Sequence, residues 1–182
     1  MKDIHKFGRW LRTWEGGFSN DPDDRGGATM WGVTLADYTK YWRSKGKGTP
    51  TAADLKRITA QEWDDILRCH YWRPAGADGI VDEWVAYYIV DCCYNSGTGY
   101  LKRIQQLLGV AADGIVGAKT LSAINYQDPA RLLNKLKAQR AAYYQSIASR
   151  RPNQQKFLRG WLRRCYAIHH GYMTTNGGQL IK

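Results

Sequence analysis

Apolar side chains recur with helical spacing along most of the chain, and the first stretch of this kind opens it. Its apolar stripe has successive spacings of three, four and three residues and consists of Ile4, Phe7, Leu11 and Trp14. Lysine and arginine side chains occupy the other faces, so the pattern predicts an amphipathic helix that ends at about Glu15. Gly16 and Gly17 come next and are suited to a left-handed C-cap.

Capping signals predict the helices that follow. Three threonines are each followed three residues later by an acidic residue, which is the spacing of a capping box: Thr34 with Asp37, Thr51 with Asp54, and Thr59 with Glu62. Residues 30–34 are expected to form a short strand before the first of these helices. Pro74 is expected to stop the third helix, because proline cannot continue the helical hydrogen bonding.

One acid interrupts the most apolar stretch of the chain. Residues 81–94 are apolar on nearly every face, which predicts a central buried helix. Asp91 lies deep within this run, and a buried carboxylate has to be hydrogen-bonded or functional. Of these two alternatives, a structural polar anchor is favoured.

Two long helices are expected after residue 128. The first begins at the pair Asp128 and Pro129, and the last covers about residues 154–169. Apolar anchors predicted for the last helix are Phe157, Trp161 and Tyr166. Residues 171–182 are polar and glycine-rich and are predicted to fray. Because few segments alternate with a period of two, the expected fold class is mainly α with a small β-hairpin.

Glu15 is the candidate catalytic acid. It is expected to lie against Leu11 and Trp14, with the negative end of the helix dipole behind it. Both desolvation and the dipole disfavour its charged form, so its pKa is expected to be raised, as a general acid near neutral pH requires. The alternative left open by the spacing is a solvated surface acid at a helix end.

Three aspartates follow in the loop of residues 21–24. Asp21, Asp23 and Gly26 match the first, third and sixth positions of a calcium loop, but Gly32 takes the twelfth, where a bidentate glutamate is needed. Calcium is therefore not expected, and no glycine-rich phosphate motif occurs either. Asx turns that close a surface loop account for Asp21 at least.

Charge and aromatic content narrow the choice of partner. The 182 residues carry a formal net charge of +11, which predicts an anionic partner such as nucleic acid or the bacterial cell wall. No zinc-ligand spacing or RNP-like motif supports nucleic acid. With 8 Trp and 12 Tyr, the chain has more aromatic side chains than its core needs, so some are expected to line a groove.

The four cysteines, Cys69, Cys92, Cys93 and Cys165, have no metal-binding spacing and are predicted to be buried, reduced thiols, as in a reducing cytoplasm. A catalytic cysteine with His70, His169 or His170 as its base is the less favoured alternative. Neither a signal peptide nor a membrane span is expected. The first 14 residues lack a continuous apolar core, and no run of 18 uncharged apolar residues occurs.

The segment EGGFSNDPDDRGGATMWGVT, residues 15–34, resembles the opening motif of the glycoside hydrolase family 108 muramidases, lysozyme-like enzymes that cut peptidoglycan. It departs from the usual motif at Phe18, Arg25, Met30 and Trp31. The resemblance implies a lysozyme-like fold with Glu15 as the catalytic acid. A similarity to the phage lysozyme arrangement implies Asp24 as the assisting acid and Thr29 as a supporting residue.

Two more parts of the site are inferred through this resemblance. The pattern D-x-x-x-N-S-G ends the apolar helix and adds Asn95 as a supporting residue. The candidate substrate-binding residues are Trp31, Gly32, Tyr38 and Trp42, and for the three aromatic residues the alternative is a place in the core. No cofactor and no metal is implied.

Residues 104–121, IQQLLGVAADGIVGAKTL, resemble the helical peptidoglycan-binding modules. The matching residues are Gln105, Leu108, Gly109, Asp113, Gly114, Gly117 and Thr120, and Ala118 stands where proline is usual. The alternative is a helix, a glycine turn and a second helix without any ligand. The chain is thus expected to contain a catalytic region over residues 1–98, a peptidoglycan-binding-like region over 99–171 and a flexible tail over 172–182.

The leading hypothesis is an N-acetylmuramidase whose partner is the glycan strand of peptidoglycan. Glu15 would protonate the glycosidic oxygen while Asp24 guides water or stabilises the oxocarbenium-like centre. The alternatives are a lytic transglycosylase that uses the same Glu15, a non-catalytic cell-wall-binding or secretion factor, and a nucleic-acid binder favoured only by charge. Without a signal peptide, a protein made in the cytoplasm needs a holin or an export system to reach the wall, as a phage endolysin does.

Overall fold

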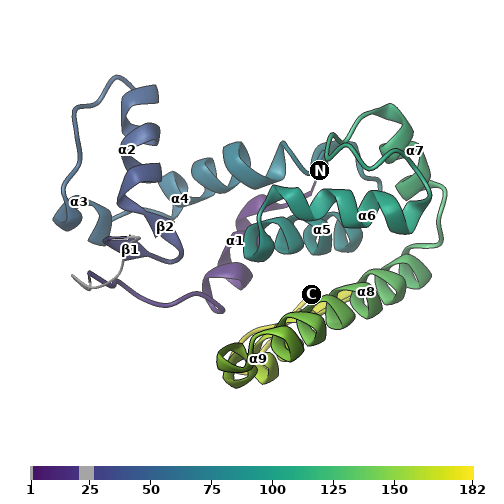
Figure 1. Cartoon of the computed structure of the whole chain (residues 1–182). Coiled ribbons are helices and arrows are strands. Elements are labelled where there is room, and N and C mark those ends of the chain that lie inside the picture. The colour runs from purple at the N-terminus through teal and green to yellow at the C-terminus, as the bar shows by residue number, and fades with distance from the viewer. Residues whose placement is uncertain (1, 21–26) are drawn as a thin grey trace. The chain divides into compact units, whose positions relative to one another are not determined.

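The computed structural model describes residues 2–20 and 27–182 and divides into two compact units (Figure 1). The N-terminal unit comprises Asp3–His70, and the C-terminal unit comprises Tyr71–Lys182 together with Lys2. Both units consist mainly of helices. The first also contains a two-stranded antiparallel sheet and the second a three-stranded one. The expected class, mainly α with a small β-hairpin, is confirmed.

The N-terminal unit runs through α1 (Ile4–Arg12), β1 (Thr29–Met30), β2 (Val33–Thr34), α2 (Leu35–Ser44), α3 (Ala52–Lys56) and α4 (Ala60–Leu67). The three predicted threonine caps are confirmed: each threonine side chain accepts a hydrogen bond from the backbone N–H three residues later. A π-helical turn, Arg68–Trp72, continues α4 and ends two residues before Pro74.

Helix α1 differs from its prediction at its end. It stops at Arg12, and its cap residue Thr13 is right-handed, with φ of −68°. The expected left-handed cap at Gly16 and Gly17 is therefore wrong. Three members of the predicted apolar stripe, Ile4, Phe7 and Leu11, are buried, whereas Trp14 lies beyond the helix and is partly exposed. Trp10 is also fully buried and is stacked on Phe7 with 5.6 Å between the ring centroids.

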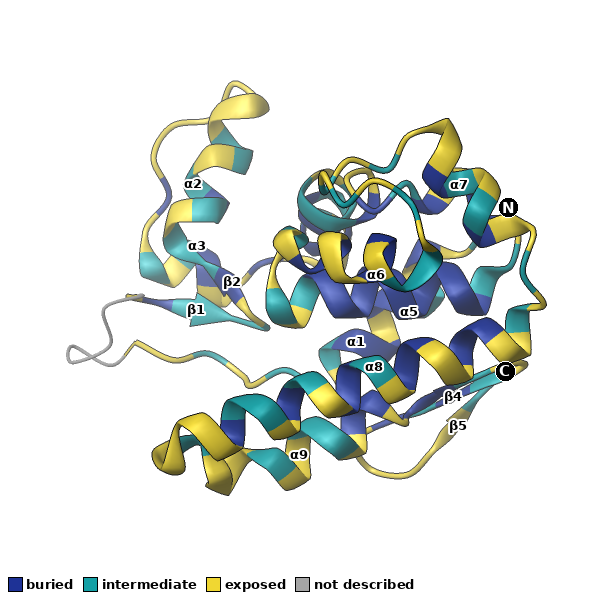
Figure 2. Ribbon diagram, turned by 45° about the vertical axis from the view of Figure 1, so that its right-hand side comes forward, coloured by how far each residue is buried: buried dark blue, intermediate teal, exposed yellow. Residues whose placement is uncertain are grey.

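The C-terminal unit is built around α5 (Glu83–Ser96), whose buried side chains are dark blue in Figure 2. Around it lie α6 (Leu101–Leu108), α7 (Ala118–Asn125), α8 (Pro129–Arg150) and α9 (Gln155–Cys165). Short 3₁₀ turns lie before α5 at Ala77–Gly79, between α5 and α6 at Thr98–Tyr100, and between α8 and α9 at Pro152–Gln154. Asp128 caps α8 by accepting from the Arg131 N–H at 2.8 Å, as the Asp-Pro pair predicts.

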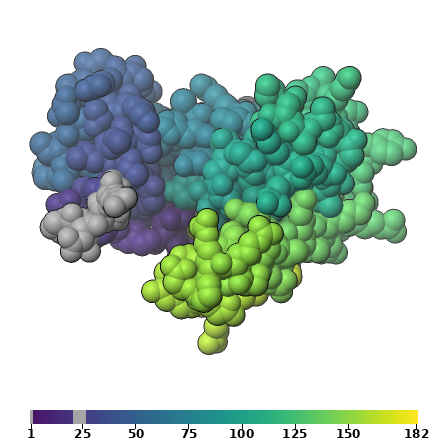
Figure 3. Space-filling view, in the orientation of Figure 1, coloured from purple at the N-terminus to yellow at the C-terminus, as the bar shows by residue number. Residues whose placement is uncertain are grey.

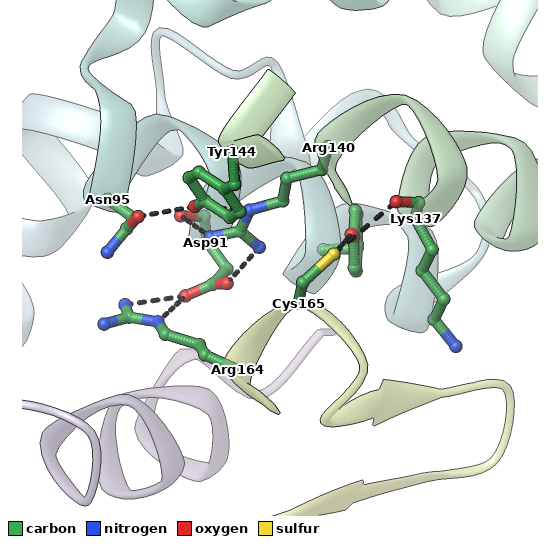
Figure 4. A network of polar contacts seen from close by, with 8 residues as sticks. Asp91, Asn95, Lys137, Arg140, Tyr144, Arg164 and Cys165 are labelled. Atoms are coloured by element: carbon green, nitrogen blue, oxygen red, sulfur yellow. Dashed lines mark hydrogen bonds and ion pairs between the residues drawn. The ribbon is translucent and has the colours of Figure 1, made fainter. Parts of the chain in front are cut away.

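Asp91 is the structural anchor of this unit, as predicted (Figure 4). Its carboxylate accepts from Arg140 Nη1 at 2.6 Å and from Arg164 Nη2 at 2.7 Å, and thereby ties α5 to α8 and α9. Burial alone would raise the pKa of Asp91, but the two guanidinium groups outweigh burial and hold the pKa below its usual value. Since Asp91 and Arg140 are fully buried, the pair is completely removed from water.

The turn between α6 and α7 is organised by Gln105. Its Nε2 donates to Asp113 Oδ1 at 2.8 Å and to the Ile115 carbonyl at 3.0 Å, while its Oε1 accepts from the Gly114 N–H at 2.7 Å. Position 114 requires glycine, because its φ of +85° is unfavourable for other residues. Several residues of the peptidoglycan-binding-like motif thus have a structural reason for their identity that requires no ligand.

The end of the chain departs from the prediction. Helix α9 ends at Cys165, and residues 168–169 form strand β3 (Ile168–His169) instead of helix. The segment expected to be a flexible, frayed tail contains β4 (Tyr172–Thr174) and β5 (Leu180–Ile181), which pair antiparallel with each other, and β4 also pairs with β3. Phe157 and Tyr166, expected to be anchors, are 45% and 49% exposed.

The thiols give a first testable prediction. All four cysteines are free; Cys92, Cys93 and Cys165 are buried as predicted, but Cys69 is exposed, so that prediction was wrong for this residue. Burial raises the pKa of Cys92, Cys93 and Cys165 and keeps them unreactive thiols.

A thiol reagent at pH 8 should titrate one cysteine in the native protein and four in denaturant. Cys69→Ser should abolish the native reaction, and a mass showing a disulfide would contradict the arrangement.

Candidate active site

Glu15 lies in the turn that follows α1. Beyond Arg12 the backbone continues with 3₁₀-type hydrogen bonds, which span three residues instead of four. The Trp14 N–H donates to the Leu11 carbonyl at 2.9 Å, and the Glu15 N–H donates to the Arg12 carbonyl at 3.3 Å. The Glu15 side chain is half-buried, whereas Gly16 and Gly17 are exposed. A carboxyl group is therefore presented from the end of a helix that is itself anchored in the core.

The β1–β2 hairpin lies next to the chain that leaves Glu15. Ser19 and Thr29 exchange two backbone hydrogen bonds, of 2.9 and 2.8 Å, so the segment four residues beyond Glu15 is fixed to β1. Thr29 is in turn paired with Thr34 across the hairpin. The glutamate and Thr29 consequently belong to two segments held together by backbone pairing.

The hairpin turn consists of Trp31 and Gly32. Both have positive φ, of 48° and 77°, as a two-residue hairpin turn of the primed type requires. Trp31 is the one non-glycine residue with positive φ in the described part of the chain. A bulky side chain makes positive φ unfavourable, so contacts with neighbouring residues have to stabilise Trp31 in this conformation.

Arg12 makes contacts that stabilise the hairpin turn. It was not among the site residues predicted from the sequence. Its guanidinium carbon lies 5.6 Å from the centroid of the Trp31 ring and 4.8 Å from that of Trp63, and its Nη1 donates to Asp64 Oδ1 at 3.0 Å. Trp63 Nε1 donates to the Trp31 carbonyl at 3.0 Å. The last residue of α1 therefore clamps the hairpin turn against α4, three residues before Glu15.

The close approach of α1 to α4 also depends on Gly8. A Cβ atom at this position would lie 2.3 Å from Asp64 Oδ1, well inside contact distance. Asp64 is 3% exposed, and its carboxylate also contacts His5 Nδ1. The helix that leads to Glu15 is thus held to α4 by a glycine contact and by an ion pair.

The two aromatic residues predicted on α2 differ in accessibility. Tyr38 is 2% exposed and its hydroxyl donates to Glu62 Oε2 at 3.1 Å, so its ring is part of the core. This burial argues against Tyr38 as a surface for stacking sugars, because stacking requires an accessible ring face. Trp42 is partly exposed, with Lys47 Nζ 5.1 Å from its ring centroid. Of the two, Trp42 keeps the accessibility that a sugar-binding residue needs.

The remaining candidates lie elsewhere. Asn95 is in the C-terminal unit at the end of α5, is exposed, and accepts from the Tyr144 hydroxyl through its Oδ1 at 2.5 Å. Asp24, like Asp21 and Asp23, lies outside the described residues. The structure thus places Glu15, Thr29, Trp31 and Gly32 on adjoining segments of one unit, and Asn95 in the other unit.

Among residues 2–20 and 27–182, no three His, Cys, Asp or Glu side chains are grouped so that they could hold a metal ion. Over the same ranges, no helix combines the length and the apolar character needed to cross a membrane.

Comparison with known protein families defines the class as a glycoside hydrolase that acts on peptidoglycan. Residues 9–97 match the family model described as glycosyl hydrolase 108, and residues 100–166 match the model described as predicted peptidoglycan domain. Residues 9–97 thus form a glycosyl hydrolase family 108 domain, and the peptidoglycan domain follows it. No curated protein matches the chain.

A solved structure supports the fold. The chain is similar to SagA from Brucella abortus, with 28% sequence identity and a TM-score of 0.66 over 91% of this chain and 94% of that one. The expected mainly α, lysozyme-like fold with a small hairpin is confirmed by this similarity. The division of roles between residues 1–98 and 99–171 stays a prediction.

Proposed function

We propose that the protein hydrolyses the glycosidic bond between N-acetylmuramic acid and N-acetylglucosamine in peptidoglycan, with Glu15 as the general acid. The leaving sugar oxygen needs a proton as its bond to carbon breaks, and a carboxylic acid within hydrogen-bond reach can deliver it. Glu15 lies in the hydrolase domain, half-buried, in the turn that follows α1. We assign Asp24 the second role, to guide water or to stabilise the positive charge that develops on the sugar.

The observation that carries this proposal is the way the turn of Glu15 is fixed. Ser19 pairs with Thr29 downstream of the glutamate, and Arg12 clamps Trp31 upstream of it. A general acid must be held in a reproducible position relative to its substrate, since small displacements lower the rate steeply. This double attachment favours Glu15 over an ordinary surface acid.

The other site residues have supporting roles in this proposal. We assign Thr29 and Asn95 the role of hydrogen-bonding a polar ligand, and Trp31, Gly32 and Trp42 the role of contacting the sugar. Tyr38 is left out because it is buried. We also propose that the enzyme acts on the cell wall after release by a holin or an export system, as endolysins of prophages do.

The new ends formed in purified peptidoglycan test the bond and the reaction type. Digestion followed by mass spectrometry should yield reducing muramic acid ends, because water takes the place of the leaving sugar. Reducing glucosamine ends would show cleavage of the other glycosidic bond. Anhydromuramic ends would show the lytic transglycosylase, and no new ends would leave only a wall-binding role.

A further inference from the structure

The charge of the protein is distributed very unevenly along the chain. Residues 1–128 contain 16 lysine and arginine residues and 16 aspartate and glutamate residues, so they are formally neutral. Residues 129–182 contain 11 lysine and arginine residues and no acid at all. The whole formal net charge of +11 therefore lies in the last 54 residues, which form α8, α9 and the β3–β5 sheet.

Five of these cations gather at the end of α8 and on α9, and we call them the basic face: Arg150, Arg151, Lys156, Arg159 and Arg163. All five are exposed. Figure 3 shows the end of α8 and the start of α9, in lime green, at the molecular surface. Within the part of the chain that the structure describes, no carboxylate forms an ion pair with Arg150, Arg151, Lys156 or Arg159. Their charges are consequently available to an external anion.

The cations of α9 form a row. Lys156, Arg159 and Arg163 are three and four residues apart, which places them on one side of the helix over about 10 Å of its length. Gly160 lies between them, and nothing within 4 Å covers the position where a side chain would be. This side of α9 is therefore an open strip that carries positive charge only.

The opposite side of α9 is apolar and packs against the rest of the C-terminal unit. Leu158, Trp161 and Leu162 pack on a buried cluster that contains Ala141 and Tyr144 of α8 and Cys165 of α9. A helix that lies on a membrane has to insert its apolar side into the lipid. Since the apolar side of α9 is packed on α8, the exposed basic face fits a water-soluble anionic chain better than a lipid surface.

We propose that the basic face binds a polymer with repeating phosphate groups that is attached to the bacterial cell wall, so that the enzyme is concentrated on its substrate. Four of the five cations are arginines, whose planar guanidinium groups match phosphate oxygens in pairs. Along α9 the cations are separated by about 4.5 and 6 Å, which suits a chain that carries one anion per short repeat. The proposal rests on the proposed action on peptidoglycan, but it concerns a different polymer and a different surface.

The test measures binding to purified cell walls that carry phosphodiester polymers and to the same walls stripped of them by hydrofluoric acid, which leaves the peptidoglycan. Glu15→Gln protein is used throughout, so that the walls persist during the measurement. The basic-face variant carries Arg150→Gln, Lys156→Gln and Arg159→Gln. Arg163 is kept, because its Nη2 donates to the Asn176 carbonyl at 2.6 Å. The matched control changes three exposed cations elsewhere, as Arg43→Gln, Arg73→Gln and Lys119→Gln.

We expect the basic-face variant to bind untreated walls about 10- to 100-fold more weakly than the parent, and the control variant to bind nearly as the parent does. Removing the phosphodiester polymer should weaken the binding of the parent to the walls by a similar factor. Adding 0.5 M salt should also weaken its binding to untreated walls, because exposed charges are screened. Circular dichroism is used to check that both variants are folded. Hydrolysis of stripped walls by the unmodified enzyme tests the proposed function separately.

Several outcomes would overturn the proposal. Equal losses in the two triple variants would mean that only net charge matters, and unchanged binding of the basic-face variant would exclude this face. Equal binding of the parent to untreated and stripped walls would exclude the phosphate polymer. Stronger retention on anionic lipid vesicles or on duplex DNA at the same salt would assign the face to a membrane or to nucleic acid.

Discussion

Replacing Glu15 by glutamine should lower the rate of wall hydrolysis by at least about 100-fold, and by up to about 10,000-fold, because general acid catalysis contributes this much in typical enzymes. Glutamine keeps the size and the hydrogen-bonding capacity of the side chain but cannot deliver a proton. The leaving sugar oxygen would then depart as an alkoxide, which is a far poorer leaving group. The measurement is the initial rate of release of soluble fragments from purified peptidoglycan.

Glu83→Gln is the matched control. Glu83 is a glutamate in the first turn of α5 and accepts from the Tyr87 hydroxyl at 3.1 Å, an interaction that glutamine can retain. Its activity should stay within a few-fold of the parent. Glu15→Gln protein that is folded by circular dichroism and still cleaves at the parental rate would show that another acid carries the reaction.

The assisting acid is tested in the same assay. Asp24→Asn should also lower the rate, and Asp23→Asn should have a smaller effect. This order follows from the assignment of Asp24 to the water or the developing positive charge. The reverse order would exchange the roles of the two aspartates.

Features that arise between near neighbours could be predicted from the sequence. The starts of α2, α3 and α4 depend on hydrogen bonds between residues three apart, such as Thr51 with Asp54, so residue types and spacing are enough to find them. Glu15 could be selected for a similar reason, since its helix and the following glycine pair are adjacent in sequence. Local sequence patterns are therefore sufficient to select the candidate acid and to predict most helix starts.

Features that depend on distant partners could not be predicted. Arg12 looked like an ordinary surface cation, because its partner Asp64 is 52 residues away and Trp31 and Trp63 meet only in the folded chain. The end of α1 differs from its prediction because the backbone changes to 3₁₀-type hydrogen bonds after Arg12, before the glycines are reached. Strands of two or three residues, such as β4 and β5, are too short to show a period of two.

Asp91 depends on both local sequence and distant partners. Its substitution is expected to have the largest effect on the stability of the protein. Its burial was predictable from the apolar run around it, but its partners Arg140 and Arg164 are 49 and 73 residues away. Asp91→Asn would leave both guanidinium groups buried without a counter-ion. Breaking a buried ion pair in this way costs about 3–5 kcal/mol, a large part of the roughly 5–15 kcal/mol by which a protein of this kind is stable.

The matched control is Asp65→Asn. Asp65 pairs with Lys45 Nζ at 3.4 Å, and the two side chains are 31% and 50% exposed. Asparagine can still accept from the Tyr41 hydroxyl, so the loss of this partly solvated ion pair should cost less than about 1 kcal/mol. The measurement is the free energy of unfolding from urea denaturation at pH 7. Equal costs for the two variants would mean that the buried network contributes no more than a surface ion pair.

The difference between Asp91→Asn and the parent should also depend on pH. Because the folded-state pKa of Asp91 is lowered, its charged form stabilises the fold above the unfolded pKa of about 3.9, and this contribution is lost as the pH falls through the folded value. The free-energy difference between parent and variant should therefore be constant from pH 5 to pH 7 and should shrink below about pH 4. Urea denaturation of both proteins across this range tests the sign. A difference that grows in acid would show that the Asp91 carboxyl is protonated in the folded protein and that the two arginines do not hold it ionised.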